Sequence, residues 1–257
     1  MTRMDKPVRA DSLGMVDRIA PLVTALGAVL TTLGFILSFV MAAPVNGATV
    51  DGVELIGDQL IGNQLLFSQK IFYFHMPVAI VSFVALGFTA YYGIRFLMTR
   101  DAAYDLRARL TTEIALVFVV MVMFSGEMWE RFEWGVWWTW EPRLTTYFIL
   151  MLLVFGYFIL RTAVDEPERR AAYSSVFGII MFVDVPICFM ITRLVPSSVH
   201  PTIFRSDSGL SPDMLIPLLL AMFGMFCVGF GIYRLRLRSE MLAQRAERIK
   251  EHLDDQR

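Results

Sequence analysis

The sequence predicts an all-α membrane protein that crosses the bilayer six times, with both termini in the cytoplasm and a tryptophan-rich segment at the outer face. Three observations predict this fold class. The 257-residue chain is 56% hydrophobic and only 18% charged, which is typical of a multi-span membrane protein. Its apolar residues gather in six long runs. Its lysines and arginines gather in alternate segments between those runs.

Each of the six runs is long enough to cross a bilayer, because about 20 residues of helix span the hydrocarbon core. We expect spans at 19–43, 71–98, 112–130, 143–162, 173–194 and 213–233. Open sheet edges are not tolerated in lipid, and no run alternates like a barrel strand, so the spans are expected to be helices. The first run is longer than the apolar core of a cleaved signal peptide, which favours an uncleaved span.

The positive-inside rule sets the orientation. With the N-terminus in the cytoplasm, eighteen of the 23 lysines and arginines fall in inner segments. The five in outer loops are Lys70, Arg131, Arg143, Arg193 and Arg205. We therefore expect a cytoplasmic segment at 1–18, a membrane domain at 19–233 and a charged cytoplasmic tail at 234–257. The expected location of the protein is the cytoplasmic (inner) membrane. The arginines of the tail are better explained as an anchor for the last span than as a nucleic-acid site.

All five tryptophans lie in twelve consecutive positions of the second outer loop, within the segment 129–146. An aromatic belt would instead spread its indoles over several helix ends and both faces. In WGVWWTWE, the positions i, i+3, i+4 and i+7 are Trp134, Trp137, Trp138 and Glu141. This spacing predicts a helix that lies along the interface and presents three indoles on one face.

Two histidines share the outer face with these tryptophans: His75, about one turn into the second span, and His200, in the third outer loop. Haem suits this set, because its iron accepts two axial nitrogens, its macrocycle packs against indoles and its propionates need cations. Arg143 and Arg205 are the candidate propionate partners, because they lie next to the tryptophans and to His200. A satisfied interfacial histidine and an arginine that reaches lipid headgroups are the alternative interpretations.

Other kinds of site are less well supported. Cys188 and Cys227 lie in apolar runs and form no CxxC or CxxCH motif, so neither a thiol redox site nor covalently attached haem is expected. Zinc usually takes three or four protein ligands, and the outer face offers two histidines and no cysteine. Asp184, at mid-depth of the fifth span, leaves both a functional and a helix-packing role open. A transporter or channel for haem or a small solute, and a protein-binding assembly scaffold, remain alternative functions.

The stretch WGVWWTWEPRLT resembles the W-G-x-x-W-x-W-D-x-R-L-T signature of the WWD haem-handling proteins of cytochrome c maturation. The six spans, IFYFHMP before the signature and an HP-containing loop after it are similar to the CcmC family of the CcmC, CcmF and CcsA superfamily. The resemblance covers roughly residues 19–233. It departs at Glu141, where the signature has Asp, and it lacks the paired tryptophan often found shortly before the second histidine.

The resemblance implies that His75 and His200 are the axial ligands of a non-covalent haem b. It implies that the tryptophans form the haem-facing surface, with Glu141 and Arg143 as polar contacts; these tryptophans are Trp134, Trp137, Trp138 and Trp140. The expected function is to hold haem at the periplasmic face and deliver it to a CcmE-type haem chaperone. No thioether bond formation, and hence no enzyme activity, is expected. The expected partners are ABC-transporter-like subunits of the CcmA and CcmB type, a small single-span CcmD-type subunit and membrane lipid.

Overall fold

The computed structural model of the chain describes residues 14–42, 69–195 and 210–256, and in these ranges the regular structure is all helical. The elements are α1 (Met15–Val40), the short 3-10 helix η2 (Gln69–Ile71), α3 (Phe72–Thr99), α4 (Ala102–Trp134), α5 (Pro142–Ala163), α6 (Pro167–Leu194) and α7 (Pro212–Asp254). Six described helices are long and apolar enough to cross a membrane. The prediction of an all-α protein with six membrane spans is therefore confirmed.

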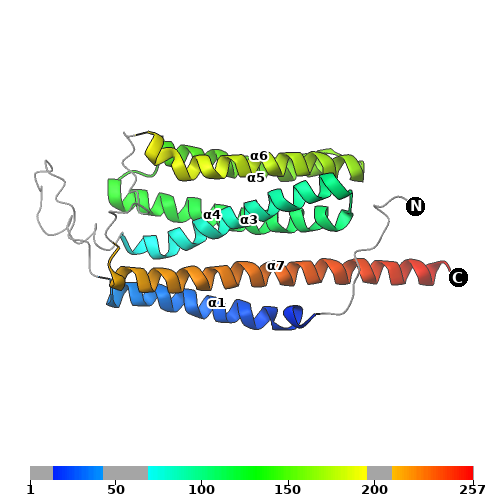
Figure 1. The fold of residues 1–257 in the computed structure, drawn as a ribbon, viewed down its shortest axis with the longest axis horizontal. Helices are drawn as coiled ribbons and strands as arrows, with labels where there is room; N and C mark the ends of the chain where they lie inside the picture. Colours follow the sequence, from blue (N-terminus) through cyan, green and yellow to red (C-terminus); the bar gives the residue numbers. More distant parts are fainter. Residues whose placement is uncertain (1–13, 43–68, 196–209, 257) are drawn as a thin grey trace, which may run out of the picture.

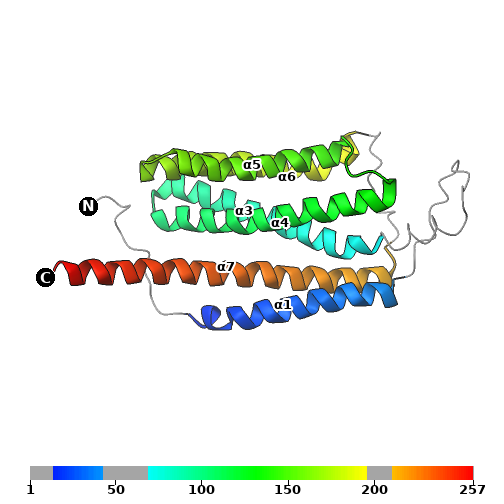
Figure 2. The same cartoon turned by 180° about the vertical axis from the view of Figure 1, so that it is seen from behind.

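The helices run antiparallel in sequence order and form three layers, in which α5 lies beside α6, α3 beside α4, and α1 beside α7 (Figure 1). The reverse view shows the same order (Figure 2). Helix α3 is central, because it packs against α4, α6 and α7. We call the end where α4 stops and α5 begins the Trp end, since residues 135–141 lie there, and the opposite end the tail end.

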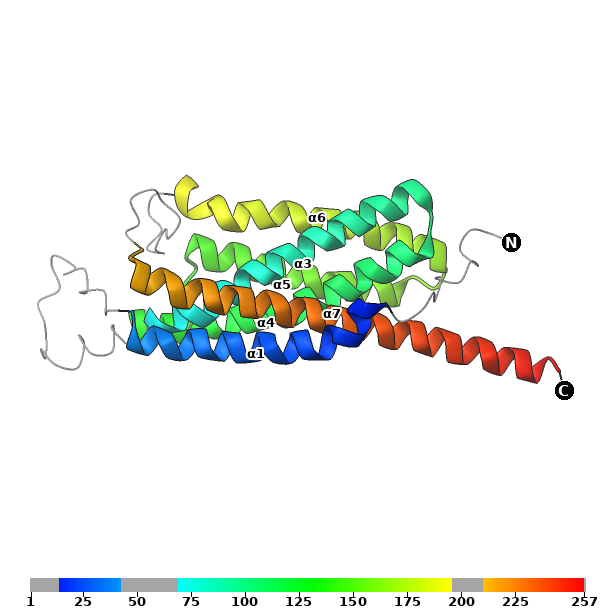
Figure 3. The ribbon, with the colours of Figure 1, turned by 60° about the horizontal axis from the view of Figure 1, so that its bottom comes forward.

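Helix α7 is a single helix of 43 residues, which joins the last expected span to the charged tail and projects past its neighbours (Figure 3). Helix α4 likewise begins at Ala102, well before the expected start at 112. Polar contacts stabilise both extensions: Asp101 caps α4 by accepting the Ala103 N–H at 2.9 Å, and Arg109 pairs with Glu240 at 2.9 Å. Hydropathy alone located the apolar part of each helix and missed these polar turns.

The core lies between α3, α4, α5 and α6, around the fully buried side chains of Leu86, Val119, Leu150 and Met181. Towards the tail end, both terminal guanidinium nitrogens of Arg161, Nη1 and Nη2, donate to Asp105, at 2.7 and 2.9 Å. This ion pair joins α5 to α4 at the tail end.

Asp184 has a partner within its own helix. The Cys188 thiol donates to the Asp184 carboxylate at 3.5 Å, and Cys188 itself is 1% exposed. This contact, one turn along α6, is the partner that the structure shows for the Asp184 carboxyl.

Glycines let α1 and α7 approach until their backbones touch. A Cβ atom at Gly34 would lie 2.7 Å from the Ala221 nitrogen and 2.8 Å from the Pro217 oxygen. A Cβ at Gly224 would lie 2.5 Å from the Thr31 nitrogen. Small residues are the usual means of close helix contact in lipid, where burying apolar side chains gains little. The position of α1 therefore depends on this glycine contact.

Lys70 joins the start of α3 to the end of α1. Its Nζ donates to the carbonyls of Ser38 at 2.6 Å and Ala42 at 2.8 Å, and the residue is 7% exposed. These carbonyls belong to the last turn of α1 and its end, where no helical N–H follows. The sequence predicted Lys70 only as a cation of an outer loop, and the structure shows that it caps a helix.

We expect Gly34→Ala to destabilise the protein by about 1–3 kcal/mol, the usual cost of overpacking, because the new methyl group would meet backbone atoms of α7. The measurement is thermal unfolding in detergent. Gly87→Ala is the matched control, because a Cβ there meets only the ring of Phe182, at 3.3 Å, and a side chain can move. Equal unfolding temperatures for the two variants would contradict this account of the α1–α7 contact.

Candidate functional site

His75 lies in the first turn of α3 and faces α4. Its Nδ1 is 2.9 Å from the hydroxyl oxygen of Ser125. Its ring meets the indole of Trp129 edge to face, with centroids 5.9 Å apart and planes at 75°. A Cβ at Gly126 would lie 3.2 Å from the Cε1 of His75, so the imidazole rests directly on the surface of α4. The structure thus places this predicted ligand in a defined position between two helices.

The Trp segment is not the interfacial helix that the sequence analysis predicted. Helix α4 stops at Trp134, and Gly135 adopts a left-handed conformation with φ of 76°, which glycine allows without a steric penalty. Residues 135–141 then form an irregular connection. The i, i+3, i+4, i+7 spacing is therefore not realised as a helical face. The chain reverses direction at Gly135, and α5 begins at Pro142.

The tryptophans of the connection instead line a groove on the outside of the bundle. Trp138 packs edge to face on Trp140 and Phe148, with centroids 5.6 and 5.7 Å apart. The groove has a volume of about 480 Å3, and its walls come from α4, the connection and α5. Its lining residues are Val120, Met123, Phe124, Glu127, Trp137, Trp138, Trp140, Phe148 and Met151. Trp140 is 73% exposed and Phe124 is 67% exposed, so the groove opens outward, away from the core.

The groove and His75 lie on opposite sides of α4. Phe124 lines the groove, whereas Gly126 touches His75, and two residues of helix correspond to a rotation of about 200°. Trp129 is on the His75 side, with Ser125 one turn before it. The structure therefore brings His75 to Trp129 and not to Trp137, Trp138 or Trp140.

Glu141, the counterpart of the Asp in the WWD signature, caps α5. Its carboxylate accepts the backbone N–H groups of Arg143 at 2.9 Å and Leu144 at 3.2 Å, and the residue is 8% exposed. These bonds satisfy donors that the first turn of a helix leaves unpaired. Its observed role is to fix the start of α5, directly after the tryptophans.

Among the described cations at the Trp end, Arg143 is the one that interacts electrostatically with His75. Its guanidinium is half-buried and close enough to interact electrostatically with His75 and with Cys188. The side chain forms no hydrogen bond or ion pair with another described residue. Arg131, in contrast, stacks over Trp137 with its guanidinium carbon 5.7 Å from the ring centroid, and donates to the Gly135 carbonyl.

Glu130 is a buried acid that the sequence analysis did not single out. It is 3% exposed, and the amide and hydroxyl of Thr139 approach its carboxylate without reaching normal hydrogen-bond geometry. It lies close enough to Glu127 and Glu141 for the three charges to interact. Among the described residues, no group of three or more His, Cys, Asp or Glu is arranged to hold a metal ion.

Ser125, Gly126 and Trp129 were also missed, although the sequence carried a signal for them. The three residues lie one helical turn apart or adjacent, so they share a face of α4. Trp129 lies outside the WWD signature, and it was given no part in the predicted site.

Of the predicted residues, His200 and Arg205 lie outside the described part of the chain, as does the side chain of Trp134.

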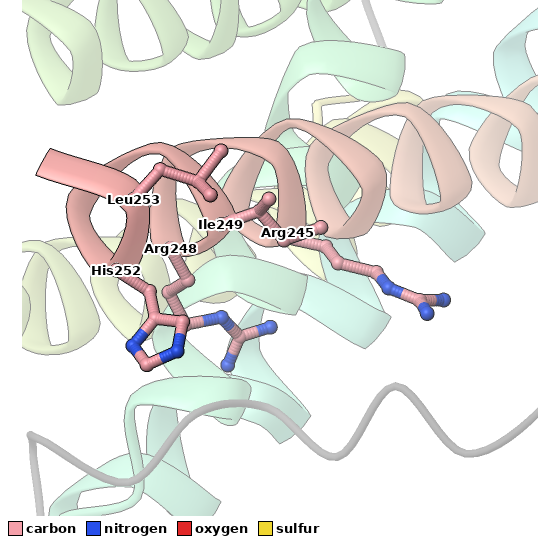
Figure 4. A pocket seen from close by; sticks show the side chains of 5 residues that line it. All are labelled: Arg245, Arg248, Ile249, His252 and Leu253. Atoms are coloured by element: carbon pink, nitrogen blue, oxygen red, sulfur yellow. The ribbon is translucent and has the colours of Figure 1, made fainter. Parts of the chain in front are cut away.

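A second concavity, of about 440 Å3, lies on the tail of α7 and is lined by Arg245, Arg248, Ile249, His252 and Leu253. All five side chains come from one helix (Figure 4). His252 contacts Gln256, with 2.9 Å between the side-chain nitrogens. One helix face cannot enclose a ligand, so the Trp end carries the stronger candidate site.

Comparison with known proteins places this geometry in context. A family model described as Heme exporter protein C matches residues 61–252, a range that contains every predicted site residue. The relative from Bradyrhizobium diazoefficiens, named Heme exporter protein C, is 28% identical over 186 residues, which cover 70% of each chain. The relative of the same name from Paracoccus denitrificans is 25% identical over 68% of this chain and 74% of its own. The Escherichia coli K12 protein of that name is 25% identical over 70% of this chain and 73% of its own.

We expect Glu141→Ala to destabilise the protein by about 1 kcal/mol, the usual cost of losing a helix cap, and to change the tryptophan fluorescence. Glu141→Asp keeps an acceptor and should restore both properties. Glu166→Ala is the matched control, because Glu166 caps α6 at the tail end by accepting the N–H groups of Glu168 and Arg169, each at 2.8 Å. This control should leave the fluorescence unchanged. An unaltered unfolding temperature and emission in Glu141→Ala would show that the cap does not hold the Trp segment.

Proposed function

The chain belongs to the heme exporter protein C family, and from this premise we propose that it binds haem at the Trp end and delivers it to a haem chaperone during c-type cytochrome assembly. The observation that carries the proposal is the state of His75. Its Nδ1 is held by Ser125, and its Nε2 forms no hydrogen bond with a described residue. An imidazole with one nitrogen anchored and the other open is the usual arrangement of a metal-ligating histidine.

The other groups near His75 also fit a haem. Haem needs axial nitrogen ligands, an apolar aromatic contact and cations for its propionates. Trp129 supplies an indole beside the imidazole. The Arg143 guanidinium, which is half-buried and unpaired among the described residues, suits a propionate. When bound, the haem would supply an iron with two axial positions, for which we propose His75 and, by resemblance, His200. Arg205 remains the second propionate candidate by the same resemblance.

The groove tryptophans require a different assignment from Trp129. They lie across α4 from His75, so a macrocycle on His75 would meet Trp129 first. We assign the exposed groove, with Trp137, Trp138 and Trp140, to the transfer step, at which a protein chaperone has to reach the ligand. Its exposed indoles support this assignment, because tryptophan is enriched where proteins bind one another.

We further propose that the Trp end faces the periplasm and that the protein resides in the inner membrane. The distribution of cations supports this orientation under the positive-inside rule, because the described arginines are concentrated towards the tail end. By family resemblance, the proposed partners are a CcmE-type chaperone and CcmA-, CcmB- and CcmD-type subunits of an exporter complex. We propose a delivery role without catalysis.

The first test is the absorption spectrum of the protein purified in detergent from haem-replete cells. We expect a six-coordinate, low-spin haem spectrum, which His75→Ala should abolish together with most of the bound haem, because one axial ligand is removed. His252→Ala is the matched control, since His252 lies on the tail helix, and it should retain the full spectrum. An unchanged spectrum in His75→Ala would overturn the axial assignment. A wild-type protein without haem would favour a solute transporter or an assembly scaffold.

The second test compares two tryptophans. We expect Trp129→Ala to shift the haem spectrum and lower haem retention several-fold, and Trp140→Ala to change both much less, because Trp129 is the one of these two that contacts His75. Trp129→Phe should recover part of the loss, since it keeps an aromatic edge beside the imidazole. Unfolding temperatures of the haem-free variants control for general destabilisation. A larger effect at Trp140 than at Trp129 would place the haem in the groove instead.

A further inference from the structure

The hydroxyl of Ser125 has three possible partners and one proton. Its oxygen is 2.8 Å from the carbonyl of Met121 and 3.2 Å from that of Val122. It is also 2.9 Å from the Nδ1 of His75. Both carbonyls can only accept a hydrogen bond, whereas the imidazole nitrogen can donate or accept. The direction of the Ser125–His75 bond therefore fixes which nitrogen of His75 carries the proton.

Two arrangements are possible for a neutral imidazole. If Ser125 donates to the Met121 carbonyl, its oxygen accepts the Nδ1–H, and both donors are satisfied. If Ser125 donates to Nδ1 instead, the proton of His75 sits on Nε2, where no described residue accepts it. The first arrangement lets the Ser125 hydroxyl form two hydrogen bonds, one donated to the Met121 carbonyl and one accepted from Nδ1–H, whereas the second gives up the bond to the carbonyl. Serine back-bonding to the carbonyl four residues earlier is also a common helical pattern.

The surroundings hold the ring in the orientation that this bond needs. Gly126 leaves room for the imidazole to lie against α4, since a Cβ there would be 3.2 Å from Cε1 and 3.8 Å from Nδ1. Trp129, one turn further along α4 than Ser125, packs edge to face against the ring. Ser125, Gly126 and Trp129 thus form one seat on α4 for the side chain of His75.

We propose that Ser125 is a positioning residue that holds His75 as the Nδ1–H tautomer and so makes Nε2 the nitrogen that ligates haem iron. The ligation of haem iron rests on the proposed function, whereas the tautomer of His75 rests only on hydrogen bonds that the protein forms without haem. A hydrogen bond from the second nitrogen of a ligating histidine fixes its orientation and increases its basicity, and loss of such a partner commonly weakens metal binding by about 10–100-fold.

The first measurement uses the full-length protein without haem. Nitrogen-15 NMR of histidine-labelled protein, with the His75 signals assigned by their loss in His75→Asn, reports which ring nitrogen is protonated. We expect Nδ1–H in the wild type and a shift towards Nε2–H in Ser125→Ala. Ser125→Thr keeps the hydroxyl and should restore the wild-type pattern. A wild-type protein with the proton on Nε2 would overturn the inference, whatever the stability of the variants.

The second measurement is haem affinity by titration of the same variants. Ser125→Ala should bind haem about 10–100-fold more weakly, and Ser125→Thr close to wild type. Ser82→Ala is the matched control: Ser82 is fully buried, donates to its own helix at 2.7 Å and contacts Tyr147 rather than His75. A loss in Ser82→Ala as large as that in Ser125→Ala would reduce the effect to general destabilisation and overturn the inference.

The measurements distinguish failure of the proposed haem binding from failure of the proposed role of Ser125. If the wild type shows the Nδ1–H tautomer but binds no haem, the proposed function fails and the role of Ser125 in setting the tautomer stands. If haem binds through His75 but Ser125→Ala changes neither the tautomer nor the affinity, the proposed function stands and the role of Ser125 is refuted.

Discussion

A helix that ends in or near a bilayer exposes backbone groups that water cannot reach easily, and the arrangement of the Trp end depends on how these groups are satisfied. Lys70 supplies donors to the last carbonyls of α1, and Glu141 supplies an acceptor to the first amides of α5. Arg131 donates to the carbonyl of Gly135, directly after α4. Three charged side chains that would otherwise suggest a polar binding site therefore close helix ends and hold the Trp segment in place.

This structural use of charge narrows the set of residues available to a ligand. Among the described residues, neither Nε2 of His75 nor the guanidinium of Arg143 has a hydrogen-bond or ion-pair partner. The two side chains lie close enough to interact electrostatically. A ligand that offers a metal ion and a carboxylate would satisfy both groups at once. Haem has these two features, so the two side chains and the family membership support the proposed haem binding by separate arguments.

The sequence predicted the spans well and the Trp segment poorly, for physical reasons. A span is defined by length and hydropathy, which are local properties, so six runs correspond to six helices. The predicted interfacial helix was wrong because spacing was weighed without Gly135, whose left-handed conformation ends α4. The contact between His75 and Ser125 could not be predicted, since it depends on how α3 is rotated against α4. Helical spacing places Trp129 on the same face of α4 as Ser125. The importance of that face becomes visible only once His75 is known to lie against α4.

Helix α4 separates two aromatic surfaces that the sequence suggested were one. On its inner side, Trp129 packs against a histidine whose ring orientation is fixed by Ser125 and Gly126. On its outer side, the exposed groove offers indoles and the carboxylate of Glu127, with no histidine among its lining residues. Tight holding and later release of one ligand place opposite demands on a single surface. Under the proposed function, the separation of the two surfaces by α4 would meet both demands, because the inner face would hold the haem and the exposed outer face would be accessible to the acceptor protein.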